Sequence, residues 1–212
     1  VLNGMGDHTA SPMLLSGVLA AILERQRTGK GRRITANLLN TGFWVLGADV
    51  SETLASGQLL DIPTRAKTQD SLVNTYKTED NKWFLVVMPD NDTNWARLCK
   101  AIERPDLISN PRYVGTIERV ANSEEIIRFL DDTFAQKSLA QWAPQLNANQ
   151  VIYAPVTDLR DALKNPQIAA NDMLRTINHP IFGEYKTLNT PIHLENTDIG
   201  PKGPAPDVGQ HT

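Results

Sequence analysis

The chain has 212 residues, and its 21 Lys and Arg against 24 Asp and Glu give a formal net charge of −3. This near balance leaves no basic footprint for nucleic acid or an anionic membrane surface. The single cysteine, Cys99, excludes an intramolecular disulfide framework and a cysteine-based zinc site. The apolar stretch Met13–Leu23 is shorter than the roughly 20 residues that span a bilayer, so we expect a soluble, cytoplasmic protein.

The two ends of the chain suggest a piece of a longer protein. The chain opens at Val1 without an initiator Met, directly before the glycine-rich turn Asn3–Asp7. It closes on Val208–Thr212, straight after a stretch rich in Pro and Gly.

The first third predicts a helix, a strand and a second helix. Ser11 and Pro12 form a favourable helix start, because Ser can cap free amides and Pro at the first helical position loses no needed donor. Apolar residues then recur at helical spacing as far as Leu23, which indicates a largely buried helix. The alternation within Arg33–Leu39 is typical of a strand, and Leu39–Ser56 indicates the second helix.

The middle of the chain predicts a small unit of helices and strands. The pattern fades over Gln58–Ser71, which we interpret as a crossing linker. Leu72–Thr78 and Trp83–Met88 indicate a β-hairpin. Helices are expected at Asp92–Arg104, at Ile117–Gln136 with a fresh start near Asn122 and Ser123, and at Leu139–Leu146. Further on, Val151–Val156 predicts a strand, Asp158 a helix cap, and Leu174–Leu194 short strands.

The first candidate for chemistry is Asp7, in the glycine-rich turn that precedes the first predicted helix. A carboxylate there lies near the positive end of a helix, and flexible glycines let a large substrate approach the backbone. Most such Gly-Asp pairs are only turns or caps. A dinucleotide fingerprint is excluded because its third glycine is missing. His8 is of interest because it adjoins Asp7.

Three other features favour structural interpretations. Gly29–Arg33 lacks the spacing of a phosphate-binding P-loop, so a turn with solvated charges is expected. Cys99 lies on the apolar side of its helix, which favours a buried thiol. The four histidines show no metal-ligand spacing, so we expect no metal site.

Several motifs occur together in a particular order. Gly6-Asp7 precedes an apolar helix that ends in Arg25 and Thr28–Gly31, and Leu38–Thr41 follows. The later motifs are Leu72–Tyr76, Arg104–Leu107, Asn110–Tyr113, Ala154–Val156, Asn165–Gln167 and Gly209–Thr212. With these motifs the chain resembles, over its whole length, the family III CoA-transferases, a group that includes formyl-CoA transferase, carnitine CoA-transferase and α-methylacyl-CoA racemase.

The resemblance implies an α/β fold with a partial Rossmann-like large domain, a small α+β domain and an interlocked homodimer. Residues 1–58 would be the large-domain segment with the Gly-Asp site, 59–147 the small domain, and 148–212 the return to the large domain. It implies that Asp7 is catalytic, with coenzyme A thioester as substrate, a carboxylic acid as acceptor and no permanently bound cofactor. Gly6, His8 and Leu38 would adjoin the acyl or CoA moiety.

Asp90 stands near the place where the racemases carry a Glu after the second hairpin strand, so it is expected close to the substrate. In the transferases the Asp forms an anhydride and then a thioester with CoA. As a racemase, the protein would instead use Asp7 with an upstream His to exchange the α-proton of a 2-methylacyl-CoA. A third alternative is an inactive fragment that only folds and dimerises. The glycine-rich loop that covers the active site in formyl-CoA transferases has no counterpart near Thr78–Pro89, so oxalate or formate specificity is not expected.

Overall fold

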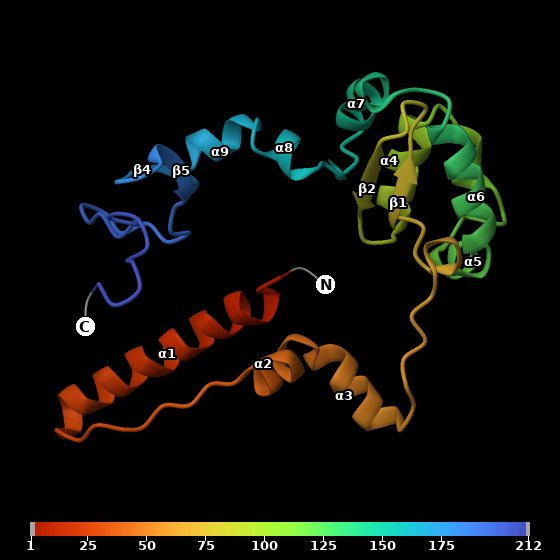
Figure 1. Cartoon of the computed structure of the whole chain (residues 1–212). Helices are drawn as coiled ribbons and strands as arrows, with labels where there is room; N and C mark the ends of the chain where they lie inside the picture. Colours follow the sequence, from red (N-terminus) through yellow and green to blue (C-terminus); the bar gives the residue numbers. More distant parts are fainter. Residues whose placement is uncertain (1–2, 211–212) are drawn as a thin grey trace. The chain divides into compact units, whose positions relative to one another are not determined.

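The structure is a computed structural model that describes residues 3–210 (Figure 1). The chain divides into two compact units, Val1–Pro63 and Thr64–Thr212. The boundary falls inside the segment Gln58–Ser71 that the sequence marks as a linker. Within residues 3–210, none of the helices combines the length and the apolar character needed to cross a membrane.

The first unit is helical and contains α1 (Met5–Thr28), α2 (Leu38–Val45) and α3 (Gly47–Ser56). Gly29 ends α1 in the left-handed conformation, with φ 72°, and donates its N–H to Arg25 O at 2.8 Å. This is the αL cap that glycine adopts without strain.

Helix α1 begins earlier than the sequence predicts. We expected its start at Ser11 and Pro12, but it starts at Met5, after Gly4 in the left-handed conformation with φ 73°. The Ser11 hydroxyl donates to Asp7 O at 2.8 Å instead of capping an amide. Pro12 therefore lies inside the helix, where it lacks the N–H that would donate to the carbonyl four residues earlier.

Two other predictions in the first unit are wrong. Arg33–Leu39 is not a strand: it stays extended up to Asn37 and has no partner strand among the described residues, and alternation alone cannot supply the missing ladder. The helix predicted over Leu39–Ser56 is divided at Leu46 into α2 and α3. Gly42 and Gly47, both poor helix formers, lie on either side of the break.

The apolar side chains of the first unit remain largely exposed. Leu19 is 52% exposed and Trp44 is 75% exposed, although the sequence indicates a largely buried first helix. Among residues 3–63, Thr41 alone is buried. Among the glycines of this unit the closest approach is at Gly17, where a Cβ atom would lie 2.9 Å from Ile34 Cγ2. Glycine at this position therefore permits the extended segment to approach α1.

The second unit is built on an antiparallel sheet of order β1-β2-β3. Its strands are β1 (Val73–Lys77), β2 (Trp83–Val87) and β3 (Tyr153–Pro155). Thr75 is paired with Leu85, and Leu85 is paired in turn with Ala154. The predicted hairpin is therefore confirmed and gains a third strand from late in the chain.

Helices cover this sheet and enclose one core. They are α4 (Asp92–Ala101), the 3-10 turns η1 (Arg65–Lys67) and η2 (Pro105–Ser109), α5 (Thr116–Ala121), α6 (Ser123–Phe134) and α7 (Leu139–Ala148). The predicted fresh start at Asn122 and Ser123 is confirmed. Tyr76, Phe84 and Phe134 are fully buried and in mutual aromatic contact, with Phe84 and Phe134 edge to face at 4.9 Å.

The last part of the chain holds short elements. Helices α8 (Leu159–Ala162) and α9 (Pro166–Ala170) precede the antiparallel hairpin of β4 (Leu174–His179) and β5 (Gly183–Leu188). The predicted cap at Asp158 is confirmed, since its carboxylate accepts the Asp161 N–H at 3.0 Å. The predicted motif Gly209–Thr212 runs into His211 and Thr212, which lie outside the described residues.

Candidate active site

Asp7 lies in the first turn of α1 rather than in a turn before the helix. The side chain is exposed. The amides of a first helical turn have no acceptor within the helix, and the helix dipole places partial positive charge there. Both effects stabilise an anion at Asp7, and the exposure leaves its carboxylate accessible to a reactant.

Gly4 and His8 form one side of this turn. Gly4 has φ 73°, which strains any residue with a Cβ. His8 donates its backbone N–H to Gly4 O at 2.9 Å. A Cβ atom on Gly4 would lie 3.4 Å from His8 Cδ2 and 3.6 Å from Nε2. The imidazole therefore packs against the backbone of the turn that begins α1.

Gly6 and Leu38 form a second contact beside Asp7. A Cβ atom on Gly6 would lie 3.6 Å from Leu38 Cδ2, so the first residue of α2 reaches the first turn of α1. Asn37 fixes the start of α2, because its side chain accepts the Asn40 N–H at 2.9 Å. Leu38 itself is 55% exposed. The structure thus brings Gly6, His8 and Leu38 together around the turn that carries Asp7.

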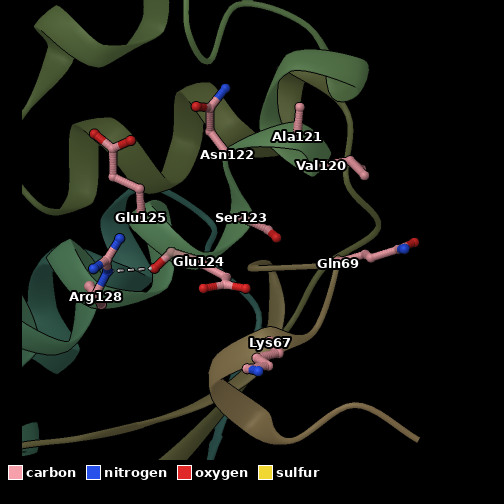
Figure 2. A pocket seen from close by; sticks show the side chains of 9 residues that line it. All are labelled: Lys67, Gln69, Val120, Ala121, Asn122, Ser123, Glu124, Glu125 and Arg128. Carbon is pink, nitrogen blue, oxygen red and sulfur yellow. Dashed lines mark hydrogen bonds between the residues drawn. The ribbon is translucent and has the colours of Figure 1, made fainter. Parts of the chain in front are cut away.

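The second unit has a hollow of about 460 Å³ beside the start of α6 (Figure 2). It is lined by Lys67, Gln69, Val120, Ala121, Asn122, Ser123, Glu124, Glu125 and Arg128. The residues that the sequence proposes for the site are all absent from this lining.

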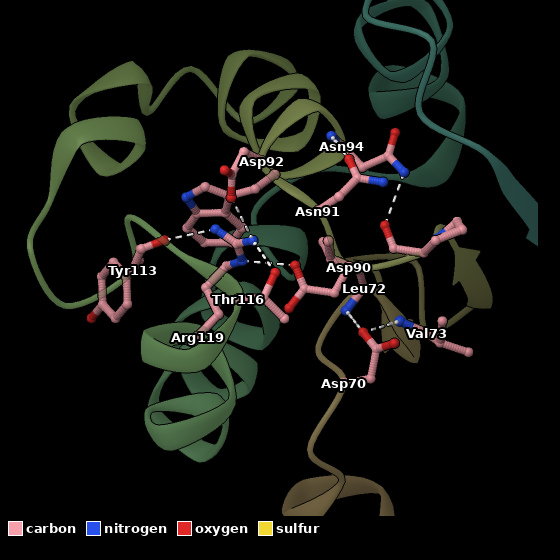
Figure 3. Close-up of polar contacts among 12 residues, drawn as sticks. Asp70, Leu72, Val73, Asp90, Asn91, Asp92, Asn94, Tyr113, Thr116 and Arg119 are labelled. Atoms are coloured by element: carbon pink, nitrogen blue, oxygen red, sulfur yellow. Dashed lines mark hydrogen bonds and ion pairs between the residues drawn. The ribbon is translucent and has the colours of Figure 1, made fainter.

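Asp90 belongs to the second unit, between β2 and α4, and its carboxylate is engaged. Asp90 Oδ1 accepts from Arg119 Nε at 2.7 Å (Figure 3). The two side chains are only 9% and 1% exposed. Burial raises the pKa of Asp90 above its ordinary value, and the Arg119 guanidinium opposes that rise. The carboxylate therefore has a structural partner.

Arg119 is the residue that sequence reasoning missed. Besides Asp90, it donates to Tyr113 O at 2.9 Å and to Asp92 Oδ1 and Thr116 Oγ1, both at 3.0 Å. Its guanidinium also lies 5.7 Å from the centre of the Trp95 ring. The two carboxylates come from more than twenty residues earlier in the chain, so local sequence offers no signal for this network.

Two further candidate features are the Cys99 thiol and a metal-binding group. Burial raises the pKa of the Cys99 thiol to about 12, so a thiolate nucleophile is not available there. In the described part of the chain, no group of three or more His, Cys, Asp or Glu is placed to hold a metal ion.

Comparisons with known proteins match this chain to CoA-transferases. The model of CoA-transferase family III matches residues 1–212. The (R)-2-hydroxy-4-methylpentanoate CoA-transferase of Clostridioides difficile is 29% identical over 209 residues, which cover 99% of this chain and 52% of that protein. The succinyl-CoA:glutarate CoA-transferase of Mus musculus is 28% identical over 210 residues, covering 98% of this chain and 47% of that protein.

The fold is shared with solved structures. A CAIB/BAIF family protein from Brucella suis matches with a TM-score of 0.81 at 22% identity, over 100% of this chain and 54% of that one. This confirms the expected fold class of mixed helices and sheet. The chain spans about half the length of the curated relatives that it matches.

Proposed function

Because the chain belongs to CoA-transferase family III, we propose that it serves the transfer of coenzyme A from an acyl-CoA donor to a carboxylic acid acceptor. The observation that carries the proposal is the accessible Asp7 carboxylate in the first turn of α1. The names of the relatives from Clostridioides difficile and Mus musculus support the same reaction class.

In the proposed reaction Asp7 is the nucleophile. Its carboxylate oxygen attacks the thioester carbonyl carbon, the C–S bond breaks, and CoA leaves as thiolate from a mixed anhydride. The thiolate then attacks the Asp7 carbonyl carbon, which releases the donor carboxylate and leaves an aspartyl-CoA thioester. The acceptor carboxylate repeats the two steps in reverse and departs as acyl-CoA, so Asp7 is regenerated. Dividing the exchange in this way is covalent catalysis, and it needs no permanently bound cofactor.

The surroundings of Asp7 suit these steps. The first-turn amides of α1 can donate to the oxyanion that develops on the attacked carbonyl. Gly6 has no side chain to obstruct a thioester, and Leu38 presents an exposed apolar group beside it. We assign Gly6, His8 and Leu38 to contacts with the acyl or CoA moiety. We also place Asp90 near the substrate, where its carboxylate would act while accepting a hydrogen bond from Arg119.

The proposed assembly is a homodimer. The first unit exposes a large apolar surface along α1 and α2, and such surface is normally covered in a working protein. An interlocked pair of chains would provide cover of this kind.

Trapping with hydroxylamine tests the proposal directly. The chain is incubated with a mixture of acyl-CoA thioesters, including a 2-methylacyl-CoA, and hydroxylamine, and the peptides are analysed by mass. We expect a hydroxamate on Asp7, none in Asp7→Asn, and an unchanged adduct in Asp49→Asn. Asp49 is the matched control because it is an exposed Asp in the first turn of α3.

Two other outcomes would overturn the transferase mechanism. The first outcome is that acyl-CoA binds, that no adduct forms, and that an incubation in D2O places deuterium on the α-carbon of the 2-methylacyl-CoA. The reaction would then be racemisation. If neither binding nor an adduct is found, the chain is an inactive fragment.

A further inference from the structure

The first turn of α1 offers different chemistry on the two sides of Asp7. Successive residues of an α-helix point about 100° apart, so Gly6 and His8 flank Asp7 on either side. The Gly6 side is apolar, because Leu38 Cδ2 would lie 3.6 Å from a Cβ atom on Gly6. The other side carries the imidazole of His8. A reactant bound over Asp7 therefore meets an apolar group on one side and a polar ring on the other.

The His8 ring is directed toward the N-terminal end of α1. A Cβ atom on Gly4 would lie 3.4 Å from His8 Cδ2 and 3.6 Å from Nε2, so this edge of the ring packs on the Gly4 backbone. Helical side chains lean toward the N-terminus of their helix, and the Asp7 side chain is subject to the same rule. Both residues are exposed. The carboxylate and the imidazole are thus accessible to one reactant at this end of the helix.

The ring nitrogens of His8 are available to a ligand. Within residues 3–210, neither nitrogen takes part in a hydrogen bond or an ion pair. His179 differs, because its Nδ1 accepts the backbone N–H groups of Ile181 and Phe182 at 3.1 and 3.3 Å. The imidazole of His179 thus stabilises a turn through its hydrogen bonds, whereas that of His8 has no such role in the described chain.

The proposed reaction generates a thiolate beside Asp7. When the C–S bond breaks, its electron pair stays on the sulfur of CoA, and the same sulfur must remain in place to attack the Asp7 carbonyl carbon. A hydrogen-bond donor stabilises such an anion, and bonds of this kind are about twice as strong as those between neutral groups. Imidazole has an N–H donor in its neutral and its cationic form. Leu38 has an apolar side chain without a donor, which suits the acyl chain.

We propose that His8 is a catalytic residue that donates a hydrogen bond to the CoA sulfur as the thioester is cleaved. The inference rests on the proposed function of Asp7. The proton stays on the ring nitrogen, so the thiolate remains a nucleophile. The acyl chain then lies on the other side of Asp7, against Leu38, and His8 thereby sets the orientation of the thioester.

The first test compares the rates at which hydroxamate forms on Asp7 in the parent chain and in two variants. Both intermediates that react with hydroxylamine arise only after the C–S bond is cleaved. His8→Ala removes the donor and should slow the reaction about 20-fold, the effect of one hydrogen bond to a charged group. His193→Gln is the matched control, because it replaces an exposed histidine of the second unit and should change nothing.

The pH dependence distinguishes a donor from a merely structural side chain. His8→Gln keeps a neutral donor but cannot become a cation, so the ratio of the parent rate to its rate should rise between about pH 8 and 5, where histidine gains its charge. The ratio cancels the titrations of hydroxylamine and of Asp7, the titratable neighbour of His8 on α1. Helix α2, which contacts this turn, contains no titratable side chain.

Two results would overturn the inference while leaving Asp7 as the nucleophile. One is a folded His8→Ala chain that forms the hydroxamate as fast as the parent. The other is a ratio of parent to His8→Gln rates that stays constant with pH.

A binding measurement separates this inference from the proposed function. The imidazole signals of His8 are followed by NMR while the full chain is titrated with coenzyme A or with its analogue that lacks the sulfur. We expect coenzyme A alone to shift these signals, and those of His193 to stay constant. Equal shifts with both ligands, or none with coenzyme A, would overturn the inference. An absent hydroxamate in the parent would overturn the proposed function, whereas the sulfur-dependent shift decides the His8 contact on its own.

Discussion

The two units of this chain are organised in opposite ways. In the second unit, the aromatic side chains of Tyr76, Phe84 and Phe134 are completely withdrawn from water. In the first unit, Thr41 is the single buried residue of the described part, and the apolar side chains of α1 and α2 face outward. A helix can therefore form its backbone hydrogen bonds internally and still leave its apolar side chains exposed to solvent.

The largest expected difference concerns thiol reactivity in the second unit. Cys99 is fully buried, so iodoacetamide can reach it only when that unit opens. With a typical domain stability, we expect alkylation of the folded chain to be at least about 1,000-fold slower than in denaturant. Mass spectrometry over time measures both rates. A folded rate within tenfold of the denatured one would show that the core is not closed.

Core truncation should have very different effects in the two units. Phe134→Ala removes a fully buried ring and should lower the free energy of unfolding of the second unit by about 4 kcal/mol. Leu19→Ala removes a side chain that is 52% exposed and should cost less than about 1 kcal/mol. Urea titrations give both values. Equal losses at the two positions would mean that α1 is covered in solution.

A buried and an exposed arginine can be compared within the second unit. Arg119→Ala leaves Asp90 buried without its partner, and should cost about 3 kcal/mol. Arg128→Ala, at an exposed position on α6, should stay within about 0.5 kcal/mol of the parent. The same urea titration distinguishes them. A small loss for Arg119→Ala would indicate that water enters the site and solvates Asp90.

The smallest expected effect lies at the start of α1. Gly4→Ala forces a Cβ into a left-handed position and should destabilise the first turn by about 1 kcal/mol. Gly47→Ala is the control, since φ is not positive there and a Cβ would meet open space in the described structure. Amide hydrogen exchange of residues 5–9 measures the stability of this turn. Equal exchange in both variants would remove the conformational argument for glycine at position 4.

The sequence predicts the structure of the second unit better than that of the first. The hairpin, the cap at Asp158 and the break at Asn122 depend on local signals, and all three are confirmed. The strand predicted at Arg33–Leu39 is wrong, because a strand exists only with a partner and the described residues supply none. Local patterns thus succeed where they need no distant contact.

The candidate site shows the same difference between local signals and contacts that are distant in sequence. Asp7 and its neighbours Gly6 and His8 are adjacent in sequence, so a short motif is enough to indicate them. Leu38 joins them only through the packing of α2 on the start of α1. The Arg119 network depends on contacts between distant segments, and no spacing rule connects a lone arginine to aspartates so far away.

Pro12 has a dynamic consequence for Asp7. Because proline lacks an N–H, the carbonyl of His8 loses its normal helical donor, and the turn carrying Asp7 is joined to the rest of α1 by one hydrogen bond fewer. Fraying of the first turn then costs less than in an unbroken helix, while the longer segment after Pro12 stays wound. The turn that carries the Asp7 carboxylate can therefore loosen without unwinding the helix behind it.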